Sequence, residues 1–468
     1  MVFSSSIFLF FFLPLVIIGH YLLREKYRVY FLLFASLFFY AWGEPRYVLV
    51  MLLSIAINYT FGILIDKAFA NKSLAKTLLV LSIALNLGIL FYFKYLDFSL
   101  SAINGIFYTG YEYKDIIMPI GISFFTFQGM SYVIDLYWRK VDVQKNPAKL
   151  AFFISFFPQL IAGPIVRYID IRDQIDRRAV SADNFAAGAR RFVIGLAKKV
   201  IIANNVGEVV DLIFALPVSE TAHATAWLGV ICYSFQIYFD FSGYSDMAIG
   251  LGKIFGFRFL ENFNYPYISK TVTEFWRRWH ISLSSWFRDY VYIPLGGNRK
   301  GNVYVNLILV FALTGFWHGA DFQFLVWGLW HGLFLLIERL FRMREVQDKK
   351  FVPLRYALTM MVVLIGWVFF RSPGLPHALN YLGLMFGLVQ PESVGFTVSY
   401  YLGPKLIFML CLAAFASTPA LKLFYNFLKN WGGVVAKQTI SVLVLVLLFV
   451  CMVFVTASSY NPFIYFRF

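Results

Sequence analysis

The feature that most constrains this chain is an apolar stretch at 302–338 with a histidine at its centre. It reads NVYVNLILVFALTGFWHGADFQFLVWGLWHGLFLLIE, two apolar arms joined by a turn of small and polar residues around His318. Loops rich in Lys and Arg stay in the cytoplasm. Basic residues flank the stretch on both sides, namely Arg299, Lys300, Arg339, Arg342 and Arg344. Both ends are therefore predicted to be cytoplasmic, and the stretch is predicted to be a hairpin.

The length of the first arm sets the depth of the turn. Residues 303–317 would extend about 22 Å as a helix, at about 1.5 Å per residue, whereas the hydrocarbon core of a bilayer is about 30 Å thick. We therefore expect the tip of the hairpin to lie deep in the membrane or near its far face. A titratable ring at that depth is costly unless it faces protein or a water-filled cavity, so His318 is a functional candidate.

The surroundings of His318 are compatible with chemistry. Gly315 and Gly319 flank it and would let a backbone or a substrate approach closely. Burial favours the neutral imidazole, which can accept a proton. The alternative is a structural role, in which the ring hydrogen-bonds to a backbone carbonyl of the turn. Asp321 could orient His318, and it could equally cap the following helix.

The composition indicates an integral membrane protein. Of the 468 residues, 60% are hydrophobic and only 14% are charged, compared with about 25% charged in soluble domains. We expect one polytopic domain over 1–468, with a retained first span rather than a signal peptide. The net charge of +16 is concentrated in short loops, which indicates orientation and contact with anionic lipid rather than binding of nucleic acid.

About a dozen apolar segments could cross or enter a membrane. They are 5–23, 28–43, 47–66, 76–96, 116–138, 150–166, 192–215, 224–250, 303–317 with 323–338, 356–370, 401–425 and 438–457. The intervening loops alternate in charge, which predicts an N-terminus outside the cell. The pattern holds only if 150–166, with its Pro and Gly residues, dips in and returns, so we expect broken helix there that lines a cavity.

A second informative stretch, 262–297, lies in a predicted cytoplasmic region. Thr271 and Glu274 have the spacing of a capping box and predict the start of a helix. On that helix, which Pro294 and the Gly296–Gly297 pair end, the large apolar residues fall on one face: Val272, Phe275, Trp276, Trp279, Leu283, Trp286, Phe287 and Tyr290. This pattern is typical of an amphipathic helix in the membrane interface. His280 lies at the edge of the apolar face and is expected to point inward.

The remaining polar residues are assigned by exclusion. His280 could be functional or simply packed between aromatic rings, and His331 is expected to line the core. His20, His223 and His377 are expected to be structural or exposed. The sequence has no HExxH motif, GxSxG motif or phosphate-binding loop, and no metal site is predicted. The acids of the DFSGYSD segment, Asp240 and Asp246, are expected in a packed polar network rather than a catalytic pair.

Several long motifs resemble those of the membrane-bound O-acyltransferase (MBOAT) family. They are PIGISFFTFQGMSYVIDLYWR, FPQLIAGPIVRY, the segment from DFSGYSD through TEFWRRWHISLSSWFRDYVYIPLGG, the hairpin's LTGFWHGADFQFLVWGLWHG and the terminal NPFIYFRF. The resemblance covers nearly the whole chain. Within the family, the chain is most similar to the branch of bacterial alginate O-acetylating membrane subunits.

The resemblance implies an all-α fold and an activity. The fold would be a ring of about 11–13 transmembrane helices, with re-entrant segments and an interfacial amphipathic helix, around a central tunnel. The motif region 262–338 would carry the two family histidines, which map to His318 and His280. Such proteins take acetyl from cytoplasmic acetyl-CoA, which is a substrate rather than a bound cofactor. They pass it across the bacterial inner membrane to an extracytoplasmic acetyltransferase partner that esterifies polysaccharide.

Three questions stay open on the sequence alone. Arg277, Arg278 and Lys270 could contact the phosphates of acyl-CoA, or they could contact lipid headgroups. His318 could act as a general base or carry the acyl group itself. The protein could instead serve peptidoglycan O-acetylation, or be an acyl-donor transporter or scaffold without chemistry of its own. The transferase hypothesis requires that a donor and an acceptor can both reach His318.

Overall fold

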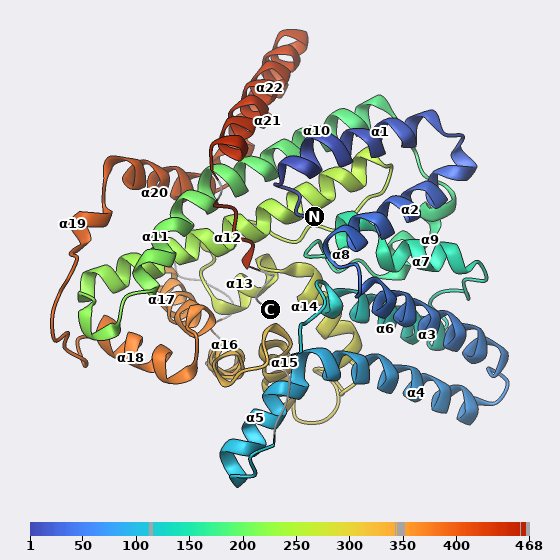
Figure 1. Cartoon of the computed structure of the whole chain (residues 1–468), viewed down its shortest axis with the longest axis horizontal. Helices are drawn as coiled ribbons and strands as arrows, with labels where there is room; N and C mark the ends of the chain where they lie inside the picture. The colour runs from blue at the N-terminus through green and yellow to red at the C-terminus, as the bar shows by residue number, and fades with distance from the viewer. Residues whose placement is uncertain (112–115, 342, 344–351, 459, 465–468) are drawn as a thin grey trace. The chain divides into compact units, whose positions relative to one another are not determined.

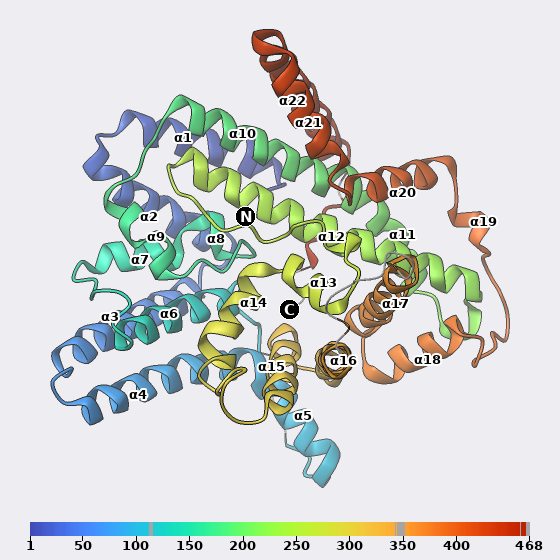
Figure 2. The same cartoon turned by 180° about the vertical axis from the view of Figure 1, so that it is seen from behind.

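The computed structural model shows a protein built of helices (Figures 1 and 2). It describes residues 1–111, 116–341, 343, 352–458 and 460–464. Within these ranges the only β pairing is an isolated bridge between Thr221 and Phe396, and no strand is formed. The all-α prediction is therefore confirmed for the part of the chain that can be described.

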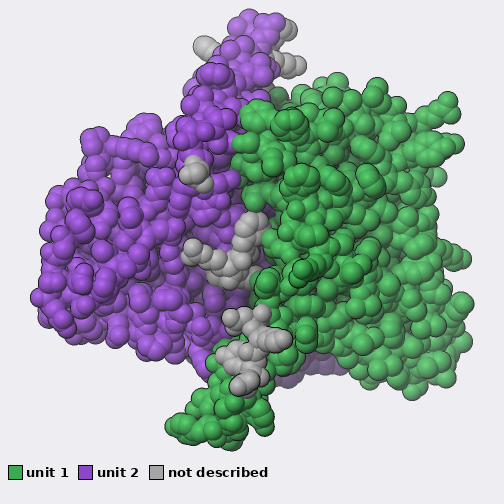
Figure 3. Space-filling model, in the orientation of Figure 1, with its two compact units in different colours: residues 1–192, 245–260 green, residues 193–244, 261–468 purple. Residues whose placement is uncertain are grey.

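The chain divides into two compact units (Figure 3). Unit 1 contains 1–192 and 245–260, and unit 2 contains 193–244 and 261–468. Two helices, α10 (Ala182–Ala197) and α12 (His223–Ile254), contribute residues to both units. The single domain expected over 1–468 stays a prediction.

Unit 1 is formed mainly by the first part of the chain. Its other helices are η1 (Phe8–Phe12), α1 (Leu13–Leu22), α2 (Glu25–Gly43), α3 (Val48–Lys67), α4 (Lys72–Leu90), η2 (Phe91–Tyr95), α5 (Leu96–Phe107), α6 (Ile122–Tyr137), α7 (Pro147–Ser155), α8 (Phe157–Leu160) and α9 (Tyr168–Asp176). A reciprocal amide pair joins α3 to α4: Asn58 and Asn86 donate to each other's side-chain oxygens at 3.0 and 3.2 Å. Such a pair satisfies buried polar groups where no water can.

Unit 2 carries all three candidate histidines. Its helices after α10 are η3 (Lys198–Ala203), α11 (Asn204–Phe214), η4 (Val218–Glu220), α12, η5 (Pro266–Ile268), α13 (Val272–Arg278), α14 (Ile281–Phe287), η6 (Arg288–Tyr292), α15 (Val303–His318), α16 (Phe322–Leu340), α17 (Val352–Arg371), α18 (Leu375–Met385), α19 (Val398–Tyr401), α20 (Pro404–Ala416), α21 (Ala420–Trp431) and α22 (Gly433–Ala457). Both views show α15 beside α16, and α21 beside α22 (Figures 1 and 2).

Several helices are long and apolar enough to cross a membrane, which supports the prediction of a membrane protein. Among the described residues they are Val48–Lys67, Lys72–Phe107, Val352–Arg371 and Gln438–Ala457. A fifth span is possible if α20 and α21 act together, although they meet at a 67° bend. These are fewer than the 11–13 expected. Some of the other apolar segments form shorter helices, such as Phe8–Leu22 and Val303–His318, whereas α2, α12 and α16 are long but do not combine length with sufficient apolar composition. The ring, tunnel and re-entrant details stay predictions.

The segment 150–166 is broken, as its Pro and Gly residues predict. Helix α7 ends at Ser155, α8 covers only Phe157–Leu160, and the chain then continues without regular structure to Tyr168. Its residues are almost entirely buried. Irregular backbone at membrane depth is tolerated where protein surrounds it, and this segment meets that condition.

A buried ion pair holds the C-terminal segment in unit 2. Lys199 Nζ lies 2.8 Å from Asp240 Oδ1, and the two side chains are only 3% and 2% exposed. Lys199 also donates to the carbonyl oxygen of Pro462, and Asp240 Oδ2 accepts from the Ile464 amide at 3.0 Å. Asp240 therefore has the packed polar role that was expected of it.

We predict that Lys199→Met lowers the free energy of unfolding by about 3–5 kcal/mol, because it leaves the Asp240 carboxylate buried without its partner. The double variant Lys199→Met/Asp240→Leu should lose much less. The matched control is the exposed pair of Lys405 and Glu208, 3.8 Å apart, where Lys405→Met should cost no more than about 1 kcal/mol. Chemical unfolding in detergent gives the free energy of unfolding of all three variants. A double variant that is as unstable as Lys199→Met would contradict the prediction.

Candidate active site

The expected hairpin is present as α15 and α16. Asn302 caps α15 by accepting hydrogen bonds from two amides of its first turn. Asp321 caps α16 by accepting from the Phe322 amide at 2.6 Å, so of its two possible roles the capping one is found. The arms pack so closely that a Cβ on Gly315 would lie 2.3 Å from the carbonyl oxygen of Phe324. Glycine is required at this position for the hairpin to close.

His318 is the last residue of α15 and lies among aromatic rings. Its ring centroid is 4.9 Å from that of Trp317, 5.0 Å from Trp327 on α16 and 5.2 Å from Phe370 on α17. All three contacts are edge-to-face, which is a favoured geometry for aromatic pairs. The side chain is 2% exposed. His318 is therefore at a convergence of three helices, with its side chain almost wholly enclosed.

His280 lies at a break in the helix that the sequence predicted as continuous. That prediction is wrong: α13 ends at Arg278, and α14 begins at Ile281. His280 has φ 43° and ψ 53°, the left-handed conformation, and the Ile281 amide donates to the carbonyl oxygen of Asn262 at 3.0 Å. This tertiary hydrogen bond takes the place of a helical one and stops the helix.

The apolar face predicted for this stretch is nevertheless buried. Its eight residues are all at most 9% exposed: Val272, Phe275, Trp276, Trp279, Leu283, Trp286, Phe287 and Tyr290. Thr271 accepts from the Glu274 amide at 3.0 Å and caps α13 as expected. Glu274, however, accepts from the Lys270 amide instead of that of Thr271. The apolar residues of α13, together with Trp279, join a core cluster with Trp327 and Trp367.

His280 and His318 lie close together in unit 2. Their ring centroids are 6.4 Å apart. His280 is completely buried, with its Nδ1 3.2 Å from Asn262 Oδ1 and the edge of its ring against Phe241, at 4.6 Å between centroids. Burial lowers the pKa of His280 to about 3, so its imidazole is neutral at physiological pH. The structure thus brings together two buried imidazoles from separate segments.

The other histidines have packing roles. His331 is fully buried, with centroid distances of 5.2 Å to Trp327 and 5.3 Å to Trp276, which agrees with its expected place in the core. In unit 1, His20 packs against Phe255 at 5.2 Å. His223 and His377 make hydrogen bonds to Leu384 and Ser372 respectively.

The three candidate cations lie on or near α13. Lys270 and Arg277 are exposed. Arg278 is partly buried, 2.9 Å from Glu274 and donating to the carbonyl oxygen of Asn264 at 3.0 Å. Lys270 and Arg277 are thus the more accessible cations, and the assignment of all three to acyl-CoA phosphates stays a prediction.

Sequence reasoning missed a carboxylate that anchors α13. Glu338, near the end of α16 and 7% exposed, accepts from the amides of Val272 and Thr273 at 2.5 and 2.8 Å, and from the Thr273 hydroxyl at 2.6 Å. A carboxylate at a helix N-terminus satisfies orphan amides and interacts favourably with the helix dipole. Glu338 therefore ties the segment that leads to His280 to the hairpin that carries His318.

The missed residues left little signal in the sequence. Glu338 ends an apolar run beside Arg339 and looks like an interfacial residue. Asn262 is 18 residues before His280, and no local pattern connects them. Trp327 and Phe370 are two of many aromatic residues in apolar segments, so only the fold singles them out as neighbours of His318.

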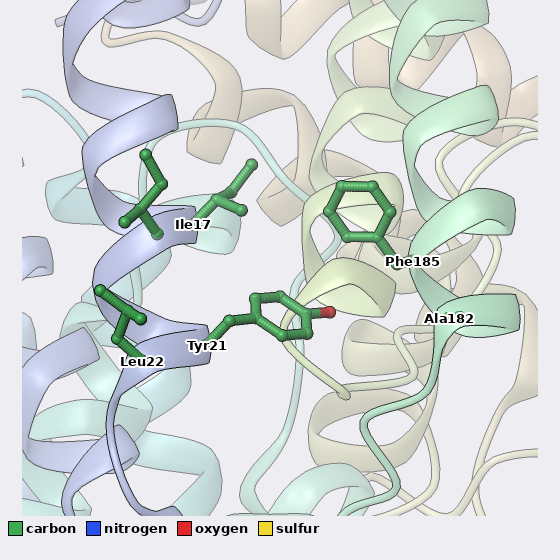
Figure 4. Close-up of a pocket in the computed structure, with 6 residues that line it drawn as sticks. Ile17, Tyr21, Leu22, Ala182 and Phe185 are labelled. Carbon is green, nitrogen blue, oxygen red and sulfur yellow. The ribbon is translucent and has the colours of Figure 1, made fainter.

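An apolar pocket of about 550 Å³ is separate from this site and belongs to unit 1 (Figure 4). Its lining comes from α1 and the start of α10: Ile17, Ile18, Tyr21, Leu22, Ala182 and Phe185. Tyr21 reaches across it and donates to the Ile254 carbonyl at 2.9 Å. None of the candidate catalytic residues lines this pocket, so we do not assign it to the chemistry.

We predict that Glu338→Ala destabilises the protein by about 1.5–3 kcal/mol, the range for a lost hydrogen bond to a charged group. It should also reduce activity, because α13 loses its anchor to the hairpin. The matched control is Glu274→Ala on the same helix, which removes a partly exposed ion pair and an exposed hydrogen bond from the Lys270 amide, and it should cost less than Glu338→Ala because both contacts are accessible to solvent. The measurement is the free energy of unfolding of each variant in detergent. Equal losses in the two variants would contradict the anchoring role of Glu338.

The pKa of His280 predicts how stability depends on pH. The pKa is about 3 in the folded state, down from 6.5. Between these pH values the unfolded chain binds a proton that the folded protein does not. The contribution of His280 to the free energy of unfolding is therefore fully present above pH 6.5 and decreases as the pH falls below 6.5. Between pH 7.5 and 5.5, the protonation of His280 in the unfolded chain should lower the free energy of unfolding by about 1.4 kcal/mol. Wild type should lose that much more than His280→Gln over this interval, and equal losses would refute the prediction.

Comparison with known proteins identifies the family. The model of the membrane-bound O-acyltransferase family matches residues 143–375, which include both histidines. A probable alginate O-acetylase of Pseudomonas putida is 41% identical over the full length of both chains. One of Pseudomonas aeruginosa is 45% identical over 82% of this chain and 75% of its own. A peptidoglycan O-acetyltransferase of Helicobacter pylori is 35% identical over 100% of this chain and 98% of its own. The chain belongs to the membrane-bound O-acyltransferase family.

Proposed function

We propose that this protein is an O-acyltransferase that takes part in the O-acetylation of an extracytoplasmic polysaccharide, alginate or a related exopolysaccharide. The observation that carries the proposal is the full-length similarity to a probable alginate O-acetylase, at 41% identity. The arrangement of unit 2 supports it, because the paired imidazoles of His280 and His318 lie within the range that matches the family.

The proposed donor is acetyl-CoA from the cytoplasm, acting as a substrate and not as a resident cofactor. In this proposal the chain spans the bacterial inner membrane with its N-terminus outside, and a tunnel through a ring of helices connects the two sides. The exposed cations Lys270 and Arg277 would meet the phosphates of the donor, with Arg278 nearby. Lipid headgroups are the competing ligands for the same charges.

His318 is proposed as the reactive group. As a general base, a ring nitrogen takes the proton of an acceptor hydroxyl while the oxygen attacks the thioester carbonyl. The carbon–sulfur bond breaks, and the proton passes to the departing thiolate. As a nucleophile, the ring nitrogen forms the bond to the acetyl carbon itself, the thiolate leaves, and a hydroxyl later displaces the imidazole. Either course requires Trp317, Trp327 and Phe370 to admit the reactants.

The acceptor is proposed to be reached through a separate extracytoplasmic acetyltransferase, which would esterify the polymer. Similarity to the peptidoglycan O-acetyltransferase of Helicobacter pylori over the whole chain favours cell-wall glycan as the second candidate for the polymer. A transporter or scaffold without chemistry of its own is the candidate from another class. It requires that activity survive the loss of His318.

We predict that His318→Ala and His318→Gln each reduce polymer acetylation by at least about 10²-fold, the contribution of one positioned acid–base group. Glutamine keeps hydrogen-bonding capacity but neither proton-transfer nor nucleophilic ability, so it should not rescue. His377→Gln is the matched control, because His377 is also a histidine of unit 2, partly buried and hydrogen-bonded to the Ser372 hydroxyl. Acetyl ester content of the secreted polymer, normalised to the amount of folded protein, is the measurement.

Two outcomes would redirect the proposal. Normal acetylation in both His318 variants would remove the chemistry and leave a transporter or scaffold. If the His318 variants lose acetylation of cell-wall glycan alone, with the exopolysaccharide unchanged, the acetylated polymer is peptidoglycan. Retention of labelled acetyl on His318 after rapid denaturation would distinguish the acyl-histidine course from general-base catalysis.

A further inference from the structure

The side chain of Asn262 faces His280 from the segment that precedes α13. It is fully buried. Its Oδ1 lies 3.2 Å from His280 Nδ1, 3.1 Å from the Ser282 amide nitrogen and 2.9 Å from the Ser282 hydroxyl. Its backbone carbonyl accepts from the Ile281 amide at 3.0 Å. One residue therefore contacts both the ring of His280 and the chain that follows it.

The backbone amide of Ser282 fixes which way the Asn262 side chain points. A backbone N–H can only donate a hydrogen bond, so the Asn262 atom at 3.1 Å from it must be the carbonyl oxygen and not the amide nitrogen. The same oxygen faces His280 Nδ1. Because that oxygen has no proton to give, Nδ1 must carry the proton, and in a neutral imidazole Nε2 then holds the lone pair.

The backbone of His280 is held in a conformation that also depends on Asn262. A left-handed φ of 43° is uncommon for a residue other than glycine and costs about 1–3 kcal/mol. The bond from the Ile281 amide to Asn262 maintains it. Nε2 has no hydrogen-bond partner among the residues that can be described, and the ring lies 6.3 Å from Trp317 and 6.4 Å from His318.

We propose that Asn262 is a positioning residue that locks His280 in the Nδ1–H tautomer and leaves Nε2 as a proton acceptor beside His318. This rests on the proposed transferase function. In the course in which His318 carries the acetyl group, Nε2 takes the proton that the acceptor hydroxyl releases as it displaces His318, so an O–H bond breaks and an N–H bond forms. The resulting imidazolium keeps its Nδ1 proton in the hydrogen bond to Asn262, and it gives the Nε2 proton to the thiolate that left the donor in the first step.

Two substitutions test the lock by their effect on rate and on pH dependence. Asn262→Ala should lower kcat about 10–100-fold with little change in KM for acetyl-CoA. Asn262→Asp keeps an acceptor at the same place, so it should recover much of kcat. Its negative charge favours the imidazolium, so the acid limb of the kcat profile should move to higher pH by about one unit. A purely structural asparagine would give neither the recovery nor the shift.

The matched control is Asn306, a buried asparagine of the same unit that donates to the backbone carbonyls of Leu295 and Gly297. Asn306→Ala should lower the melting temperature without moving the pH profile. If both Asn262 variants fail to fold, wild-type protein with ¹⁵N-labelled histidine still decides the question. The His280 signal, assigned by its disappearance in His280→Gln, should show the proton on Nδ1, and a proton on Nε2 would overturn the proposal.

His280→Ala separates this inference from the function on which it rests. If it acetylates normally, His280 has no part in the reaction and the proton-acceptor role proposed for its Nε2 fails, while the proposal for His318 stands. If it is inactive while Asn262→Ala keeps wild-type kcat and Asn262→Asp keeps the wild-type pH profile, the tautomer lock is wrong and the transferase proposal stands.

Discussion

The hydrogen bonds between the Glu338 carboxylate and the first amides of α13 are the constraint on which the histidine pair depends. Helix α13 has only seven residues and is too short to be stable without tertiary contacts. Glu338 fixes its beginning, and Asn262 fixes the chain just beyond its end. Because Glu338 belongs to α16, it fixes the start of α13, and with it the position of His280, relative to the hairpin that carries His318. The positions of the two imidazoles follow from these two polar anchors.

Burial has two opposite consequences at this site. The aromatic rings around His318 and His280 keep both imidazoles away from water, and burial lowers the pKa of His280 to about 3, so that its ring is neutral. The same rings leave His318 only 2% exposed. In the proposed function, a reactant therefore reaches His318 only after side chains that enclose it, such as Trp317, Trp327 or Phe370, move. Edge-to-face contacts are individually weak, at about 0.5–1.5 kcal/mol each, and binding of a large donor could supply the energy to rearrange them.

The sequence predicted what depends on local pattern and missed what depends on distant partners. The arms expected at 303–317 and 323–338 correspond to α15 and α16 within a few residues, because apolar length and flanking charge define them. The break at His280 was missed, because the acceptor that stops the helix is the carbonyl of Asn262, far from it in sequence. The periodicity of the apolar residues alone predicts a helix that continues through Trp279 and His280. The anchoring role of Glu338 was missed for the same reason.

In the proposed function, His318 is the place where the donor thioester meets its acceptor. An experimental structure with a thioether analogue of acetyl-CoA, whose carbon–sulfur bond cannot be cleaved by acyl transfer, tests this most directly. We predict that the acyl carbonyl carbon lies about 3–3.5 Å from a ring nitrogen of His318, with Trp317, Trp327 or Phe370 displaced. An analogue bound elsewhere, with His318 still enclosed by the same three rings, would contradict it.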